Sequence, residues 1–235
     1  YDQVEFSPDG RYLARIGGSD GGLEVWDVVT WEGPSRKILS GEMRCFAFSP
    51  DSRRVAISVE TSIEVYDTAT WSIYKYLDPN LGGRDISGSI RTISWFPNNR
   101  DIVFGTTGEI RIWNTRENVI RGSQDFLHPD AFKPRGVFGD SRRMFGYDVR
   151  AVDCSPARTT GAMLFAAGTD DGNITIWDGH AFSFSKPVAS AFVGGTCQSL
   201  KFSPDGSLLA SASGESGSDA ERTIKVWRVH SGRRP

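Results

Sequence analysis

The chain has 235 residues, of which 38% are hydrophobic and 24% charged, and its formal net charge is −2. This balance is that of a folded globular protein, and it excludes a nucleic-acid or membrane partner recognised through overall charge. No stretch reaches the roughly 18–20 apolar residues of a membrane-spanning helix. Glycine is frequent, and short β-branched or aromatic runs alternate with turn residues, which predicts an all-β chain.

From residue 4 onward, five segments repeat one series of elements: an alternating strand, a proline turn, a more apolar strand, a polar hairpin and a third strand. The first strand with its turn covers residues 4–10, 46–52, 93–99, 152–156 and 200–206. The apolar strand follows around residues 12–14, 55–57, 102–104, 164–166 and 208–210. The third strand covers residues 23–27, 63–67, 110–114, 174–178 and 224–228. Alternation places every second side chain of the first strand on one face, whereas the apolar second strand is expected to pack on both faces.

An aromatic residue stands at the same place in each third strand, and these residues recur at intervals of roughly 40 residues or more. They are Trp26, Tyr66, Trp113, Trp177 and Trp227. Together with the Ser-Pro turns, the pattern resembles the WD-repeat family over nearly the whole chain except residues 115–148. The resemblance implies a single all-β domain, 1–235, folded as a WD-repeat β-propeller with five recognisable blades. The blades are expected at about 1–40, 41–78, 88–123, 148–190 and 195–235.

The number of blades in the complete ring is left open by the sequence. The fifth segment stops where its outer strand would begin, and family members commonly have seven blades. The resemblance therefore implies a larger ring of about seven blades, and a self-closed ring of five is the alternative. In the larger ring, the missing blades would come from the rest of the chain or from a second copy.

The repeats depart from the family in its side-chain hydrogen-bond network. The Gly-His pair that precedes the first strand in the family is missing from every repeat. The Asp that stands six residues before the Trp is present as Asp20 and Asp171, while Glu60, Thr107 and Glu221 occupy the matching positions elsewhere. We expect this network to be incomplete in every blade. Stability should then depend on packing, with each buried Trp or Tyr contributing roughly 1.5–3 kcal/mol.

Residues 115–148 form the largest insertion between repeats. The segment contains several phenylalanines and arginines, and residues 138–143 echo residues 48–54 of the second repeat. We expect a loop packed over the edge of the propeller. A collapsed blade is the alternative.

The sequence predicts no catalytic site, metal site or cofactor. Residues 17–21 match Gly-x-Ser-x-Gly, but that nucleophile motif requires a strand–turn–helix context, and here it falls in a hairpin. The cysteines have no close spacing, so neither a disulfide framework nor a zinc site is indicated, and a reducing location in the cytoplasm or nucleus is expected. They are Cys45, Cys154 and Cys197.

One position in the repeat predicts a binding site. By the resemblance, the residue five places before the Ser of Ser-Pro opens the inner strand at the rim of the central channel. The residues there are Asp2, Arg44, Arg91, Arg150 and Gln198, with Asp170 on a neighbouring hairpin. Guanidinium groups suit bidentate binding of carboxylates or phosphates. The alternative is that nearby carboxylates neutralise the arginines and leave a solvated rim; these are Glu42, Asp148 and Asp170.

The function implied by the resemblance is a non-catalytic interaction scaffold. It would dock segments of other proteins, acidic or phosphorylated ones included, on its face or rim, within a multi-subunit complex or as the regulatory part of a larger signalling protein. A non-protein anionic ligand at the channel mouth, such as a glycan, phosphate or nucleic acid, is the second interpretation. No membrane partner is expected. Fold alone does not decide between these functions.

Overall fold

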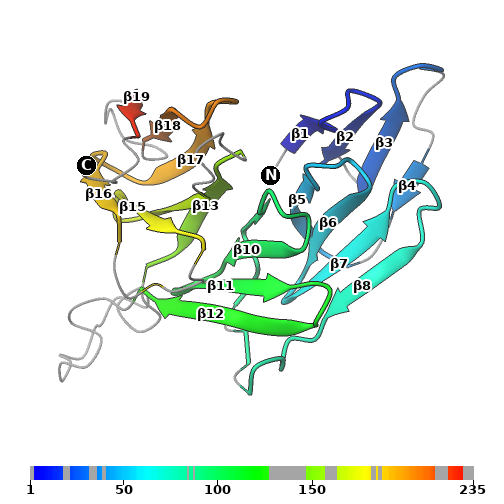
Figure 1. The fold of residues 1–235 in the computed structure, drawn as a ribbon, viewed down its shortest axis with the longest axis horizontal. Helices are drawn as coiled ribbons and strands as arrows, with labels where there is room; N and C mark the ends of the chain where they lie inside the picture. The colour runs from blue at the N-terminus through cyan, green and yellow to red at the C-terminus, as the bar shows by residue number, and fades with distance from the viewer. Residues whose placement is uncertain are drawn as a thin grey trace.

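The computed structural model describes residues 3–17, 22–31, 36–38, 41–83, 85–86, 88–126, 147–156, 163–180, 184, 187–214 and 222–229. Within these ranges the secondary structure consists of nineteen strands and no helix (Figure 1). Accordingly, nothing in the described ranges is a helix long and apolar enough to cross a membrane.

The strands form five antiparallel sheets, which we call blades 1 to 5 in chain order. Blade 1 contains β1 (Gln3–Phe6), β2 (Tyr12–Ile16), β3 (Leu23–Asp27) and β4 (Arg36–Ile38). Blade 2 contains β5 (Met43–Phe48), β6 (Arg54–Val59), β7 (Ser62–Asp67) and β8 (Ile73–Leu77). Blade 3 contains β9 (Thr92–Trp95), β10 (Asp101–Gly105), β11 (Glu109–Asn114) and β12 (Val119–Asp125). Blade 4 contains β13 (Val149–Cys154), β14 (Leu164–Thr169), β15 (Asn173–Asp178) and β16 (Ala189–Phe192), and blade 5 contains β17 (Cys197–Phe202), β18 (Leu208–Ser213) and β19 (Thr223–Arg228).

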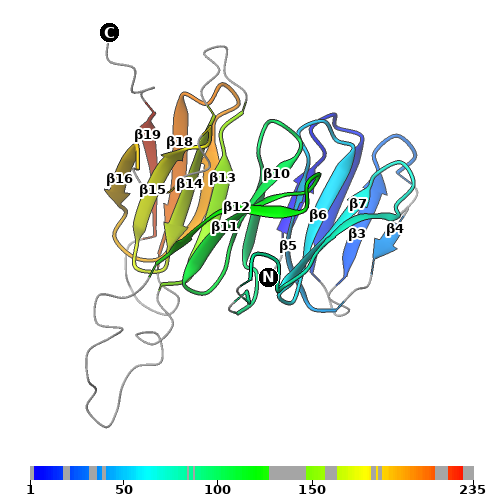
Figure 2. The same cartoon turned by 60° about the horizontal axis from the view of Figure 1, so that its bottom comes forward.

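The blades follow one another around a central axis, so the predicted all-β propeller with five blades is confirmed (Figure 1). Their first strands lie innermost, and contacts run from β1 to β5, β5 to β9, β9 to β13 and β13 to β17. Figure 2 shows the blades side by side, each turned relative to the next. Blades 1 and 5 are the two ends of this arc (Figure 1).

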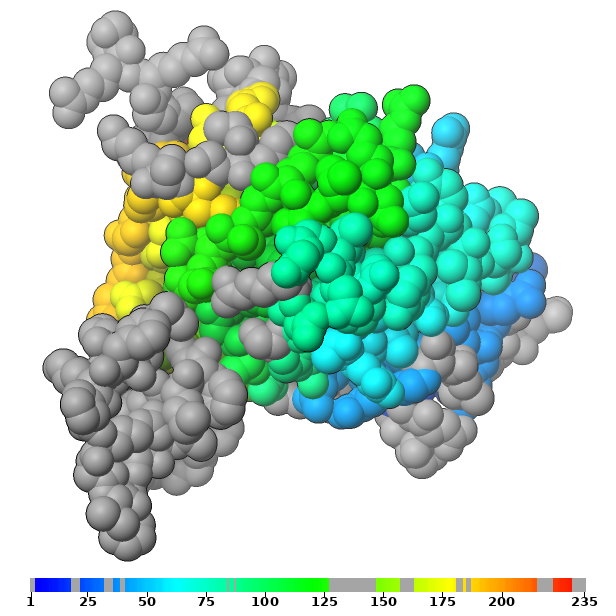
Figure 3. Space-filling model, turned by 90° about the horizontal axis from the view of Figure 1, so that it is seen from below, coloured from blue at the N-terminus to red at the C-terminus, as the bar shows by residue number. Residues whose placement is uncertain are grey.

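Four hydrophobic cores hold the propeller together, and each lies between two consecutive blades. In blades 2 to 5 the third-strand aromatic residue always faces the preceding blade; these residues are Tyr66, Trp113, Trp177 and Trp227. The aliphatic residues one and three places before it face the following blade, as Val25 and Leu23 do in blade 1. Between blades 2 and 3, the connecting segment adds Ile86 and Ile90 to the core. In the space-filling view the outer parts of these two blades meet along one continuous surface (Figure 3).

The second strands differ in burial according to the position of the blade. Every residue of β10 and β14 is buried, as expected for a strand packed on both faces. In β2 and β18 buried residues alternate with more exposed ones. The expectation of two packed faces is therefore wrong for blades 1 and 5. Each of these blades has a neighbour on one side within the described chain, so one face of its sheet is left uncovered.

In blades 1, 2, 3 and 5 the proline turn has a left-handed residue at its fourth position. In blades 1 and 5 this residue is glycine, whereas blades 2 and 3 have Ser52 (φ 59°) and Asn99 (φ 55°). These two side chains reach back to the preceding blade: Ser52 Oγ accepts from the amide of Asp9 at 3.0 Å, and Asn99 Oδ1 accepts from the amide of Asp51 at 2.9 Å. The strained conformation is thus coupled to a hydrogen bond between blades.

Substitutions at Asn99 are expected to separate these two contributions. Asn99→Gly relieves the left-handed strain but loses the hydrogen bond, so the free energy of unfolding should fall by about 1 kcal/mol or less. Asn99→Ala loses the bond and keeps the strain, so the fall should be about 2 kcal/mol. Gly10→Ala serves as the strain-only control, because its φ is 74° and no atom lies within 4 Å of the added Cβ. Urea denaturation measures all three, and equal values for the two Asn99 variants would contradict the argument.

The ends of the large insertion meet beside blade 3. The amide of Tyr147 donates to the carbonyl of Phe126 at 2.8 Å, and the amide of Phe126 donates to that of Gly108 at 2.7 Å. The loop was expected over residues 115–148, but Val119–Asp125 of this segment form β12, the outer strand of blade 3. Residues 127–146, where the rest of the loop would lie, are outside the described residues.

Candidate functional site

A channel runs along the axis of the propeller, and the first strand of every blade contributes to its wall. The cavity has a volume of about 840 Å³ and is lined by residues from β1, β5, β9, β13 and β17. Inner strands carry unpaired backbone groups on their channel side, and these need partners. The channel is therefore the place where polar side chains of several blades meet.

The structure brings four of the predicted rim residues together on the channel wall. They are Arg44 on β5, Arg91 immediately before β9, Arg150 on β13 and Gln198 on β17. We call the three arginines the arginine rim. Each is partly exposed, so the guanidinium groups are accessible from the channel mouth. The fifth predicted residue, Asp2, lies outside the described residues.

Carboxylates pair with every member of the arginine rim, and Arg91 and Arg150 keep donors without a partner among the described residues. Asp148 Oδ2 forms ion pairs with Nη2 of Arg91 at 3.3 Å and with Nη2 of Arg150 at 3.1 Å, so one oxygen is shared by two guanidinium groups. Arg44 Nη2 lies 2.6 Å from Oε1 of the exposed Glu42. A guanidinium has five N–H donors. The Nε atoms of Arg91 and Arg150 are buried and have no hydrogen-bond partner among the described residues.

Asp170 is bonded to the backbone of Asp148 and, within the described residues, forms no ion pair with the arginine rim. Its Oδ1 accepts from the backbone amide of Asp148 at 3.1 Å, and its own amide donates to the Asp148 carbonyl. Burial raises the pKa of Asp170, and the charge of Asp148 raises it further, against the lowering effect of Arg150. Asp170 therefore fixes the backbone that carries Asp148, while Asp148 orients two of the arginines.

A second polar layer, which the sequence analysis missed, lies about 10 Å deeper, three residues further along the inner strands. We call it the mid-channel layer, and it consists of Glu5, Ser94, Asp153 and Lys201. Asp153 Oδ1 accepts from Lys201 Nζ at 3.2 Å and from Ser94 Oγ at 3.4 Å, and its Oδ2 accepts from the amide of Phe202 at 2.7 Å. Burial raises the pKa of the Glu5 and Asp153 carboxyl groups, and the charge of Lys201 opposes this rise. The signal in the sequence is a polar or charged residue two places before the first residue of the proline turn.

Side chains of the inner strands also join neighbouring blades. Thr92 Oγ1 accepts from the amide of Val152 at 3.0 Å. The Gln3 side chain both accepts from the amide of Phe46, at 3.0 Å, and donates to its carbonyl, at 2.8 Å. Such bonds satisfy backbone groups that a sheet edge would otherwise leave unpaired. Thr92 and Gln3 therefore use their side chains to join neighbouring blades, whereas the guanidinium groups of the arginine rim are partly exposed in the channel.

The residues assigned a structural role in the repeat are only partly where they were expected. Tyr66, Trp113 and Trp177 are buried, whereas Trp26 and Trp227 are half-buried. Trp26 and Trp227 are thus less buried than the other three, because blade 1 has no preceding blade among the described residues and β19, which carries Trp227, is the last described strand of its sheet.

The polar residues of the repeat act locally. Asp171 caps its hairpin by accepting from the Thr169 hydroxyl and from the amide of Asn173, the latter at 3.2 Å. Trp227 Nε1 donates to Ser211 Oγ at 3.0 Å, and Trp113 Nε1 donates to Asn118 Oδ1 at 3.1 Å. Asp20 lies outside the described residues, as do all but the first residue of the Gly-x-Ser-x-Gly match.

The three cysteines are buried and free, and burial raises the pKa of Cys45 to about 12 and that of Cys197 to about 11. These thiols are therefore protonated and act as small apolar side chains. In the part of the chain that the structure describes, no group of three or more His, Cys, Asp or Glu residues could hold a metal ion.

Repeated blades around a polar channel define the class of protein: a repeat β-propeller with an accessible mouth. The sequence profile described as WD domain, G-beta repeat, matches residues 3–27, 139–178 and 186–228. The matched residues cover a little under half of the chain, and they are similar to the repeats of WD-repeat proteins, which are typically non-catalytic and generally act as scaffolds for other proteins.

Three curated proteins are similar to the chain over nearly its whole length. WD repeat-containing protein 1 of Xenopus tropicalis is 25% identical over 96% of the chain and 33% of its own length. Actin-interacting protein 1 of Drosophila melanogaster is 24% identical over 97% of the chain and 33% of its own length. Apoptotic protease-activating factor 1 of Homo sapiens is 24% identical over 96% of the chain and 19% of its own length. The chain thus spans about a third, or less, of these proteins.

Proposed function

We propose that the chain is a non-catalytic interaction scaffold that binds acidic or phosphorylated segments of other proteins at the arginine rim. The observation that carries the proposal is the pair Arg91 and Arg150, which share one carboxylate oxygen of Asp148 and keep further donors at the channel mouth. Asp148 holds both guanidinium groups in place, and such preorganisation lowers the entropy lost when a ligand binds. Protein binding at this face agrees with the general role of the family.

The arginine rim indicates the chemistry of the partner, and the cysteines indicate the cellular location. A segment with several carboxylates or phosphates would engage more than one arginine and gain bidentate hydrogen bonds. The name of the Drosophila relative makes actin one candidate partner to test. Three free, buried cysteines agree with a reducing location, in the cytoplasm or nucleus.

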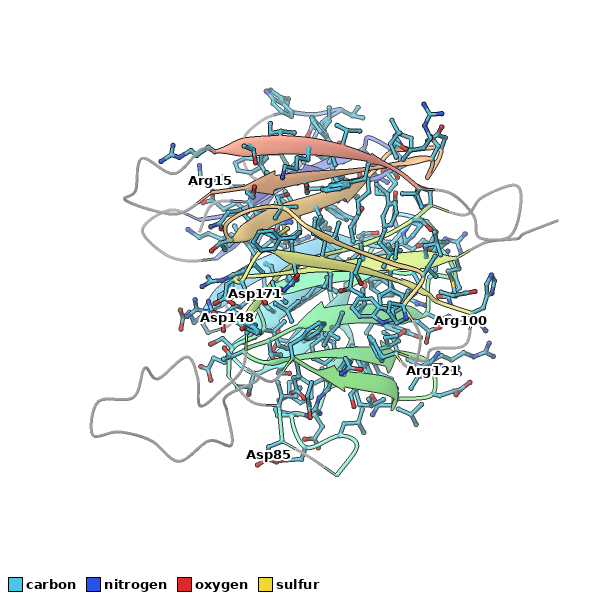
Figure 4. The ribbon with its side chains drawn as sticks, turned by 90° about the vertical axis from the view of Figure 1, so that its left-hand side faces the viewer. Arg15, Asp85, Arg100, Arg121, Asp148 and Asp171 are labelled. Atoms are coloured by element: carbon cyan, nitrogen blue, oxygen red, sulfur yellow. The ribbon has the colours of Figure 1, made fainter. Side chains whose placement is uncertain are left out.

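The test compares two charge-reversal variants. In the first, Arg44, Arg91 and Arg150 become Glu. In the second, the matched control, Arg11, Arg53 and Arg100 become Glu; these three exposed residues follow the left-handed turn residue in blades 1 to 3. Figure 4 shows Arg100 at the face opposite to Asp148, so the control changes the same net charge at the other end of the channel.

Binding of a short fluorescent polyglutamate peptide, of a phosphoserine peptide and of actin is measured by anisotropy at several salt concentrations. The rim variant should bind the preferred ligand at least about tenfold more weakly, as expected when a few ion pairs of roughly 0.2–1 kcal/mol each are lost. The control variant should change affinity by less than about twofold. An equal loss of affinity in both variants, or no loss in either, would contradict binding at the arginine rim. Preferential binding of an oligonucleotide or of inorganic phosphate at the rim would instead favour a non-protein anionic ligand.

A further inference from the structure

The mid-channel layer carries a charge opposite to that of the arginine rim above it. At the rim, three arginines are paired with two carboxylates, Glu42 and Asp148, which leaves one positive charge in excess. In the mid-channel layer, two carboxylates and one ammonium group leave one negative charge in excess; these groups belong to Glu5, Asp153 and Lys201. The charge of the channel wall therefore changes sign with depth, and each layer favours a ligand group of the opposite charge.

Asp153 is already bonded within the protein, so the excess negative charge belongs to Glu5. Both carboxylate oxygens of Asp153 have donors from other blades: Lys201 and Ser94 at Oδ1, and the amide of Phe202 at Oδ2. Asp153 in turn holds the Lys201 ammonium group at 3.2 Å, although the Lys201 side chain is 71% exposed. These two charges neutralise each other across the boundary between blades 4 and 5.

Glu5 keeps acceptor capacity that the described part of the protein does not use. Within the described residues its carboxylate has one hydrogen bond, a long one of 3.5 Å from Gln3 Nε2. An ionised carboxylate offers about four acceptor positions. Glu5 is half-buried on the channel wall, and burial raises its pKa while the charge of Lys201 opposes this rise. A partly desolvated carboxylate of this kind gains more from pairing with a cation than a carboxylate in bulk water does.

The distance between the two layers determines which cation can reach Glu5. The layers are three residues apart along the inner strands, which corresponds to about 10 Å. An extended lysine side chain spans roughly 6 Å from Cα to Nζ, which leaves roughly 4 Å from the rim to the level of Glu5. This remainder is the reach of an ion pair. A segment bound by Arg44 of blade 2 and Arg150 of blade 4 carries its intervening residues over the channel, which is lined by both arginines and by Glu5.

We infer that the channel below the arginine rim is a cation subsite, in which a bound acidic segment inserts one lysine side chain and pairs its ammonium group with Glu5. The inference rests on the proposed function, because the acidic groups of the segment hold it at the rim. It makes Glu5 a specificity-determining residue and gives the preferred ligand as a lysine with acidic residues on both sides. The channel volume of about 840 Å³ is ample for one such side chain.

The test uses the fluorescent polyglutamate peptide with its central residue changed to lysine, norleucine, acetyllysine or diaminopropionate. Norleucine and acetyllysine remove the charge, whereas diaminopropionate keeps the ammonium group on a side chain shorter by three methylene groups. Each peptide is titrated by anisotropy into the native chain, into Glu5→Gln and into the matched control Glu60→Gln. Glu60 is exposed, its amide donates to the Glu42 carbonyl at 3.0 Å, and it is not among the residues that line the channel.

The lysine peptide should bind the native chain about fivefold more tightly than each of the other three peptides. This preference should disappear in Glu5→Gln and persist in Glu60→Gln, with circular dichroism showing that both variants are folded. Equal binding of the lysine and diaminopropionate peptides, or a lysine preference that survives in Glu5→Gln, would overturn the inference while leaving binding at the arginine rim intact. Failure of every peptide to bind the native chain would contradict the proposed function, and this inference with it.

Discussion

Gly168→Ala is expected to lower the free energy of unfolding by about 3 kcal/mol, although it adds a single methyl group. An added Cβ at Gly168 would lie 2.3 Å from Sγ and 2.9 Å from Cβ of Cys197, which is fully buried in the core between blades 4 and 5. The backbone of Gly168 is an ordinary strand, so the effect is steric. Gly105 has the same position in blade 3, where a Cβ would lie 2.4 Å from Cγ1 of Val149. At both places β-sheets of neighbouring blades approach too closely for a side chain.

A double-mutant cycle measures this effect directly. Cys197→Ala alone should cost about 1 kcal/mol, because it removes one buried sulfur atom. In the Gly168→Ala background, the same change removes the atom closest to the new methyl group and should recover part of the lost stability. The coupling between the two sites, read from urea denaturation, should therefore be favourable by about 1 kcal/mol or more. Simple additivity would show that the sheets separate without strain and would contradict the argument.

The local pattern of the sequence was sufficient to predict the fold class and the repeat. Alternation in β1, the proline turns and the third-strand aromatic residues each recur within a single repeat and can be read from it. Burial, by contrast, depends on the neighbouring blade. Trp26 and Trp177 have the same local sequence context, yet one is half-buried and the other buried. No pattern inside a repeat could distinguish them.

The sequence likewise predicted one part of the candidate site and not the rest. Aligning the repeats placed Arg44, Arg91 and Arg150 on one channel wall because equivalent residues of a propeller share one height along the axis. The same alignment contains the mid-channel layer, but Asp153 and Lys201 stand in different blades and become a pair only when blades 4 and 5 meet. The sequence predicted Asp148 as a carboxylate beside the rim, but not that one of its oxygens pairs with arginines of two blades, which depends on how blades 3 and 4 meet.

Trp177→Ala is expected to lower the free energy of unfolding by about 3–5 kcal/mol, whereas Trp26→Ala should lower it by about 1 kcal/mol. Trp177 is stacked on Phe165 with ring centroids 5.3 Å apart and meets Phe184 edge-on at 5.5 Å. Its removal leaves a cavity inside the core between blades 3 and 4. Trp26 has the same role in the repeat but faces away from blade 2, so less apolar surface is buried and less is lost. Urea or thermal denaturation of the two variants measures the difference.

Trp177→Phe and Trp26→Phe are the matched controls, because each retains an aromatic ring and reduces only its size. The ratio of the two losses of unfolding free energy is a stronger test than either value alone, because Trp177→Ala and Trp26→Ala remove the same atoms from the same unfolded chain. Similar losses at both positions would mean that the exposed side of blade 1 already has a partner in solution.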